Sequence, residues 1–287
     1  MVIIIGLVVI CGGIVWGFTH AGGKLGDLFH ISEIVTIISM ALGSMIIMSP
    51  AKVLKQILGM VLAIFKGAPL KKSDFDDLLK VMYELFVIGR RNGMIALEEH
   101  VMGPEKSTIF KKYPSFHENH EALEFLCDGL RPIVDGKIKP DQLEPLMDKS
   151  LKSIEHEQHT PPMVLSKVSD ALPGFGIVAA VLGIVITMAA IAGDVSAVGE
   201  KIGAALTGTL LGVFLCYGIV GPLATNMEFY NHGKMTYLNC IKAAVVAFAN
   251  GLPPPVAIEF GRRMLEEDMR PSASELESML KAAAAQK

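Results

Sequence analysis

An uncharged stretch of 23 residues, Ala171–Gly193, constrains this chain more than any other feature. As a helix rising about 1.5 Å per residue, it is long enough to cross a hydrocarbon layer about 30 Å thick. Glycine and alanine recur along it at three- and four-residue spacing, a pattern that lets another helix approach closely. A second apolar stretch, Ile202–Pro222, repeats this pattern and contains the GxxxG pair Gly208 and Gly212. We therefore expect two transmembrane helices that pack against each other.

Two further apolar blocks, Val2–Phe18 and Ile34–Met48, are also candidates for membrane helices. The first has no basic segment before it and no small-residue cleavage site after it, so we interpret it as a retained helix rather than a signal peptide. Hydrophobic residues make up 51% of the chain and are concentrated in these blocks. The sequence thus predicts an all-α integral membrane protein with four transmembrane helices and a large helical cytoplasmic domain.

The distribution of positive charge predicts the orientation. Of the 26 Lys and Arg residues, 17 lie between Ala51 and Asp170 and 7 lie after Pro222. Only Lys24 and Lys201 remain for the two short connections. Because basic residues are enriched on the cytoplasmic side, we expect a multi-pass membrane protein with both termini in the cytoplasm.

Four segments follow from this layout. Residues 1–50 hold the first two membrane helices, and 51–170 form a cytoplasmic loop that begins with a helix along the bilayer surface. Residues 171–222 hold the third and fourth membrane helices, and 223–287 form cytoplasmic helices and a tail. No alternating pattern of useful length predicts a strand.

Local signals in the cytoplasmic segments predict where helices end. An amphipathic helix over Asp141–His159 is expected to end at Pro161 and Pro162, because proline removes a backbone donor. Gly93 makes a helix across the charged segment Gly89–His100 doubtful. The last residues, KAAAAQK, are expected to be frayed.

A proline lies at one end of each small-residue stretch. Pro173 falls in the first turn of one and Pro222 in the last turn of the other, so antiparallel helices place both prolines at the same membrane face. One interpretation is that Pro173 only begins its helix and Pro222 only ends its own. The other is that paired breaks at one face act as hinges.

The four apolar stretches contain no Asp, Glu, His, Lys or Arg. Proton and cation pathways in membranes usually need such a group at depth. If ions pass here, the titrating carboxylate should come from a partner helix held against the small-residue faces. Thr207 and Thr209 offer hydroxyls to such a path, although a threonine in a membrane helix more often bonds to its own backbone.

Charged residues flank Gly93 on both sides. Arg90 and Arg91 precede it, and Glu98 and Glu99 follow it. In a continuous helix Arg90 and Glu98 would lie about 80° apart around the axis and face water together. Seen in isolation, such a cluster is a solvated charged face.

Several functions find no support in the sequence. A net charge of -3 gives no reason to expect nucleic acid, and the four cysteines show no CxxC or disulfide framework. The chain lacks phosphate-binding, dinucleotide and hydrolase motifs, so nothing indicates an enzyme or a cofactor. Two histidine pairs at i,i+3 spacing have too few further ligands to predict a metal site.

Five motifs in order resemble the MotA family of flagellar motor stator proteins, within the wider group of MotA, TolQ and ExbB proton channels. They are RRNGMIALEE from Arg90, LPGFGIVAAVLGIV from Leu172, TGTLLG from Thr207, GPLA from Gly221 and PPPVAIEFGRR from Pro253. The resemblance extends over nearly the whole chain. It implies a protein of the bacterial inner (cytoplasmic) membrane. It also implies a ring of five chains around two copies of MotB, whose membrane helix supplies the ion-binding aspartate.

The resemblance also implies roles for single residues. Torque would pass to the rotor protein FliG through Arg90 and Glu98, and Pro173 and Pro222 would couple ion passage to a change of shape. Sodium-driven members resemble this chain at Thr209 but have threonine at the position of Ala180. A sodium ion needs several oxygen ligands, so the missing hydroxyl favours protons as the coupling ion.

The residues that would line the ion pathway are therefore Gly176 and Ala180 on the third stretch and Thr207 and Thr209 on the fourth. Two alternatives stay open. A TolQ or ExbB type energiser of outer-membrane processes shares the small-residue helices but has three spans. A passive membrane scaffold would use the same faces only to pack helices.

Overall fold

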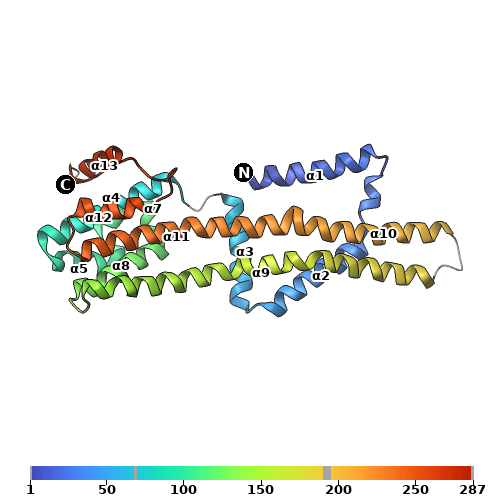
Figure 1. The fold of residues 1–287 in the computed structure, drawn as a ribbon, viewed down its shortest axis with the longest axis horizontal. Coiled ribbons are helices and arrows are strands. Elements are labelled where there is room, and N and C mark those ends of the chain that lie inside the picture. Colours follow the sequence, from blue (N-terminus) through green and yellow to red (C-terminus); the bar gives the residue numbers. More distant parts are fainter. Residues whose placement is uncertain (1, 68–69, 190–194, 286–287) are drawn as a thin grey trace. The chain divides into compact units, whose positions relative to one another are not determined.

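The computed structural model describes residues 2–67, 70–189 and 195–285, and across these ranges the chain forms helices and no strand. In chain order the longer helices are α1 (Val2–His20), α2 (Ile31–Met48), α3 (Ala51–Lys66), α4 (Lys72–Asn92), α5 (Met94–Met102), α8 (His120–Val134), α9 (Pro140–Ala189), α10 (Val195–Phe214), α11 (Gly221–Ala249), α12 (Pro254–Arg263) and α13 (Ala273–Ala285). Shorter helical turns are η1 (Leu25–Leu28), η2 (Pro104–Lys106), α6 (Thr108–Lys111), α7 (Pro114–His117) and the π-helix η3 (Leu215–Val220). The prediction of an all-α chain is confirmed (Figure 1).

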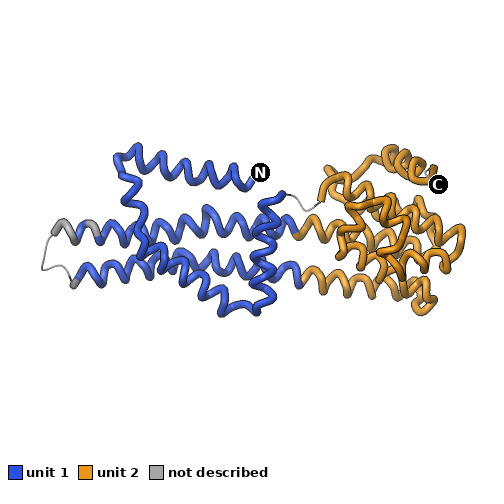
Figure 2. The backbone as a smooth tube through the Cα atoms, turned by 180° about the vertical axis from the view of Figure 1, so that it is seen from behind, with its two compact units in different colours: residues 1–67, 157–230 blue, residues 68–156, 231–287 orange. Residues whose placement is uncertain are grey.

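The chain divides into two compact units, coloured separately in Figure 2. Unit 1 comprises residues 1–67 and 157–230, and unit 2 comprises residues 68–156 and 231–287. The segment boundaries expected at 170 and 222 fall inside α9 and α11. Both helices continue beyond their apolar stretches. At residues 170 and 222 the amino-acid composition changes, but the helical backbone is not interrupted.

Unit 1 contains the four predicted membrane stretches, each in a helix long and apolar enough to cross a bilayer. The second helix begins at Ile31, three residues before the expected start. The third stretch is helical through Ala189, and its expected end at 190–193 lies outside the described residues. No residue of α1 is buried within the chain, as expected for a helix that contacts lipid or other chains.

The helix expected along the bilayer surface is α3, which begins after Pro50. Its Ile57 and Ile64 are buried, and Ile64 packs with Leu165, Ala224 and Met227. On its polar side, the Lys52 Nζ lies 2.6 Å from the Glu157 carboxylate of α9. The helix is therefore fixed to α9 on two sides within unit 1, and its position at the bilayer surface stays a prediction.

Unit 2 has a continuous apolar core between α4, α5, α8, the first part of α9 and the second part of α11. The rings of Phe86 on α4 and Phe248 on α11 stack with centroids 4.4 Å apart. Beside this core, the buried Glu84 carboxylate accepts hydrogen bonds from the Tyr113 hydroxyl at 2.7 Å and the Lys112 ammonium at 2.8 Å. A buried carboxylate is tolerated when such partners are present.

Two predicted helix ends are wrong. Pro161 and Pro162 lie inside the continuous helix α9 instead of ending it. Both are buried, as are Val164, Leu165 and Val168 further along the helix. We infer that burial of this apolar face outweighs the backbone hydrogen bonds that the prolines forgo.

The second wrong prediction concerns the C-terminal residues, which are helical as far as Ala285 instead of frayed. Lys281–Ala285 continue α13, because Leu280 and Ala283 are buried and the Lys281 ammonium pairs with Glu277 at 2.6 Å. The last two residues lie outside the described ranges. The alanine-rich end is therefore stabilised as a helix by burial and by an ion pair, which cannot be predicted from its composition.

Candidate functional site: the small-residue helix pair

The contact between α9 and α10 in unit 1 is made by glycine backbones. A Cβ atom on Gly212 would lie 2.6 Å from the Leu172 carbonyl oxygen and 2.9 Å from the Gly176 Cα. A Cβ on Gly176 would lie 2.8 Å from the Gly208 carbonyl oxygen. Because real Cβ atoms do not approach so closely, the helices keep this distance only with glycine at these positions. The predicted packing of the two stretches is confirmed.

Neither Pro173 nor Pro222 lies where the backbone helix begins or ends. Pro173 lies within α9, and Pro222 is the second residue of α11, which follows η3 and α10 without a break. The interpretation that they only begin or end helices is therefore wrong. The reason is that α9 starts far upstream and α11 continues far downstream of the apolar stretches.

A π-helical turn immediately precedes Pro222. In η3 the Gly221 amide donates to the Cys216 carbonyl oxygen, five residues back. The Ser169 hydroxyl of α9 donates to the same carbonyl at 3.0 Å. A Cβ on Gly221 would lie 2.8 Å from that oxygen, so the turn also depends on glycine there. Such π-turns often occur at functional sites, and no sequence signal predicted this one.

The structure places the four predicted pathway residues within the α9 and α10 pair. Gly176 and Ala180 are buried, and the Ala180 amide nitrogen lies 3.6 Å from where a Cβ on Gly208 would be. Thr209 is half-buried. The Thr207 hydroxyl donates to the Gly203 carbonyl oxygen at 3.0 Å, which confirms the alternative that this threonine bonds to its own helix.

One carboxylate in the membrane unit escaped the sequence analysis. Glu33 lies in the first turn of α2, within the candidate span Leu25–Met48, and is 7% exposed. The statement that the spans hold no ionisable group is therefore wrong. It was based on an apolar block that began at Ile34, whereas the helix begins three residues earlier at Ile31. A search for acids at the edges of apolar blocks would have found Glu33.

The outward faces of α9 and α10 are covered with large apolar side chains. The exposed ones include Ile177, Val181, Ile184 and Val185 on α9 and Leu206 and Leu210 on α10. Exposed apolar surface of this extent is suited to lipid or to further membrane helices.

In unit 2, the charged residues around Gly93 are all exposed. Gly93 has φ +85° and separates α4 from α5, so the doubt about a continuous helix is confirmed. Arg90 lies in the last turn of α4 and donates one hydrogen bond of 3.5 Å to the Gly251 carbonyl oxygen, and Glu98 lies on α5. Across the described ranges, neither residue is in an ion pair.

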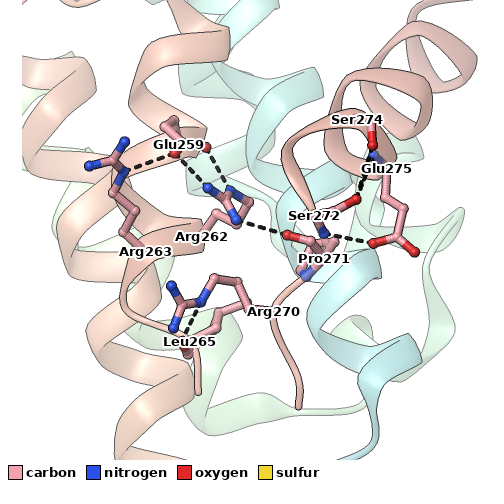
Figure 3. Close-up of polar contacts among 9 residues, drawn as sticks. All are labelled: Glu259, Arg262, Arg263, Leu265, Arg270, Pro271, Ser272, Ser274 and Glu275. Carbon is pink, nitrogen blue, oxygen red and sulfur yellow. Dashed lines mark hydrogen bonds and ion pairs between the residues drawn. The ribbon is translucent and has the colours of Figure 1, made fainter. Parts of the chain in front are cut away.

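A second charged cluster joins α12 to the segment before α13 (Figure 3). The Arg262 guanidinium donates two hydrogen bonds of 2.7 Å to the Glu259 carboxylate and one of 2.8 Å to the Pro271 carbonyl oxygen. These Arg262 hydrogen bonds, with a smaller contribution from Arg263, lower the pKa of Glu259 to about 2. The cluster is thus built to hold the chain that leads into α13.

Two family descriptions match separate parts of the chain. The Motility protein A N-terminal family matches residues 4–93, and the MotA/TolQ/ExbB proton channel family matches residues 117–230. The first match contains most of α1 and all of α2, and the second contains the small-residue pair.

Curated relatives match over nearly their full length. Chemotaxis protein LafT of Vibrio parahaemolyticus is 37% identical over 96% of this chain and 95% of its own. Motility protein A of Salmonella typhimurium is 35% identical over 98% of this chain and 96% of its own, and that of Escherichia coli has the same identity and coverage.

Solved structures share the fold at lower identity. A chain of C. jejuni MotAB superposes with a TM-score of 0.76 at 21% identity, covering 94% of this chain and 98% of its own. A chain of the flagellar MotAB stator complex from Bacillus subtilis gives 0.71, also at 21% identity, covering 89% and 92%. With the four membrane helices and the small-residue pair, these matches show that the chain belongs to the Motility protein A branch of the MotA/TolQ/ExbB proton channel family.

Proposed function

We propose that this chain is the MotA-type stator subunit of a bacterial flagellar motor and converts proton flow into torque with a MotB-type partner. The observation that carries the proposal is the full-length similarity to Motility protein A. The solved relatives of the same fold are MotAB complexes, which supports a MotB-type partner here. A pentameric ring around that partner is the assembly implied by the resemblance.

The partner helix would lie against the apolar face of the small-residue pair and supply the titrating aspartate. Ala180 and Thr209, with Gly176 and Thr207 nearby, would then border the ion pathway. The hydroxyl of Thr207 is bonded within its own helix, so Thr209 is the better candidate for a water contact. Thr209 offers one hydroxyl, and Ala180 offers none where sodium-driven members have a threonine. Because sodium needs several oxygen ligands, this favours protons as the coupling ion.

Pro173 and Pro222 would transmit the ion-driven change of shape. Each removes a backbone donor inside a continuous helix, and Pro222 directly follows the π-turn η3. One proton crossing 100 mV supplies about 2.3 kcal/mol, which is enough to bias a bend but not to unfold a helix.

Unit 2 would be the cytoplasmic domain that acts on the rotor. Arg90 and Glu98 are exposed, and neither is needed for the core, as expected for residues that contact the rotor protein FliG. In this proposal the chain lies in the inner membrane, in contact with lipid, and the distribution of basic residues supports an orientation with both termini in the cytoplasm.

The test is complementation of a strain that lacks its own stator chain, with the MotB-type partner supplied. The wild-type chain should restore swimming, and charge reversal at Arg90 or Glu98 should reduce torque while the complex still assembles. Arg91→Glu and Glu99→Lys are matched controls that change neighbouring exposed charges. Failure of the wild-type chain to restore rotation with any partner would refute the proposal. Equal effects of all four reversals would refute only the assignment of the rotor contacts.

A further inference from the structure

A buried carboxylate and a cavity lie together at one end of the membrane unit. The cavity has a volume of about 320 Å³ and is lined by His30, Ser32, Glu33, Gly183, Ile186, Lys201 and Ala204. These residues come from α2, α9 and α10 and from the residue before α2. All of them belong to unit 1.

The Glu33 side chain is fixed against the small-residue pair. A Cβ on Gly208 would lie 3.2 Å from the Glu33 Cγ, so the absent side chain of Gly208 leaves the room that the stem of Glu33 occupies. The Ser32 hydroxyl donates to the Glu33 Oε2 at 2.7 Å. Within the described part of the chain no cation lies at ion-pair distance from this carboxylate.

A helix N-terminus alone does not account for this arrangement. An acid in the first turn does interact favourably with the helix dipole, but an exposed side chain does so without the cost of desolvation. Glu33 is 7% exposed, has one hydroxyl donor and borders a cavity large enough for several waters. A buried ionisable group within a candidate membrane span is a candidate for ion transfer.

The chemistry of the lining favours a proton over a metal cation. One carboxylate and one hydroxyl are too few oxygen ligands for sodium, and the basic residue Lys201 lines the same cavity. A carboxylate needs only a water chain to accept a proton from hydronium and return it to water. Besides Glu33, the titratable groups of the lining are His30 and Lys201, and the Asp27 side chain on η1 is exposed.

We propose that Glu33 and its cavity form a proton-binding site at the outer mouth of the pathway, where Glu33 takes a proton from external water and passes it inward through water. This rests on the proposed function and on the orientation with both termini inside. A hydronium ion gives one proton to a Glu33 oxygen and leaves water, and the carboxyl then gives that proton to a water on the path. No net chemistry occurs at the site.

The test measures rotation of single motors at low and high load, with the full chain and its MotB-type partner. At low load, steps are fast and proton delivery limits speed, whereas at high load the mechanical step limits it. Glu33→Gln should therefore reduce low-load speed several-fold and leave high-load torque near wild type. Glu33→Asp should restore most of the speed, and Asp27→Asn, which removes an exposed acid nearby, should behave as wild type.

Other results would overturn the site. Wild-type low-load speed in Glu33→Gln, or an equal loss at both loads that Glu33→Asp does not relieve, would leave only a structural role for Glu33. A wild-type speed that rises with external sodium at fixed pH, and loses this dependence in Glu33→Gln, would make it a sodium site. Rotation by the wild-type chain tests the stator function by itself. The role of Glu33 is tested separately, by the differences in speed between its variants and the wild type.

Discussion

The Ser169 hydroxyl donates a hydrogen bond of 3.0 Å to the carbonyl oxygen of Cys216, which is also the acceptor that closes the π-turn before Pro222. This buried contact joins α9 to the point where the backbone of the opposite helix departs from α geometry. It places a side chain of one proline-containing helix in contact with the irregular turn of the other. We therefore regard Ser169 as a residue that positions the π-turn before Pro222.

Ser169→Ala should destabilise the protein by about 1 kcal/mol, the net value of a typical hydrogen bond. The measurement is the unfolding midpoint of the purified complex. Ser44→Ala is the matched control, because the Ser44 hydroxyl bonds only within its own helix, to Ala41 at 2.9 Å. Equal midpoints for the two variants would mean that the contact with Cys216 adds nothing specific.

Gly212→Ala should prevent the close approach of α9 and α10. The added methyl group would lie 2.6 Å from a backbone oxygen, which no rotamer change relieves. We expect a loss of folded, membrane-inserted protein, measured as the amount that co-purifies with the partner. Gly174→Ala is the control, since a Cβ there has nothing within 4 Å. A normal yield of Gly212→Ala would contradict the packing described here.

The Glu259 cluster predicts a dependence of stability on pH. The Arg262 hydrogen bonds lower the pKa of Glu259 from its ordinary 4.5 to about 2, so the folded state holds the ionised form more strongly than the unfolded state. The stabilisation is present above pH 4.5 and is lost as the pH falls toward about 2. The stability difference between wild type and Glu259→Gln should therefore shrink across this window. A difference that stays constant from neutral to acid pH would contradict it.

Tyr113→Phe should destabilise unit 2. The Tyr113 hydroxyl donates to the buried Glu84 carboxylate at 2.7 Å, and removing one donor from a buried charge costs about 1 to 3 kcal/mol. Burial and this hydrogen bond also raise the pKa of Tyr113, so raising the pH through the ordinary tyrosine range should not ionise it. Absorbance of tyrosinate at high pH, compared between wild type and Tyr113→Phe, measures the second effect. Titration of Tyr113 at its ordinary pKa would refute it.

The sequence predicted those features that depend on local composition. Four apolar helices and the break at Gly93 follow from hydropathy and from backbone chemistry. The close packing of the two small-residue stretches follows from the spacing of their glycine and alanine residues. These rules need only the neighbours of each residue along the chain, which explains why they succeed.

The remaining features depend on contacts between segments. Pro161 and Pro162 stay in α9 because that face is buried, and no local rule weighs packing against a lost backbone donor. Glu33 was missed because an acid just outside an apolar block gives no sign that α10 will cover it. The π-turn depends on Ser169, 47 residues away from Cys216 along the chain.

The most direct test of the account is swimming speed against external sodium, with and without a protonophore. The strain should carry this chain and its MotB-type partner as the only stator. We expect a speed that does not respond to sodium and that collapses with the protonophore. A speed that follows sodium and survives the protonophore would contradict the claim that proton flow through this chain drives the motor.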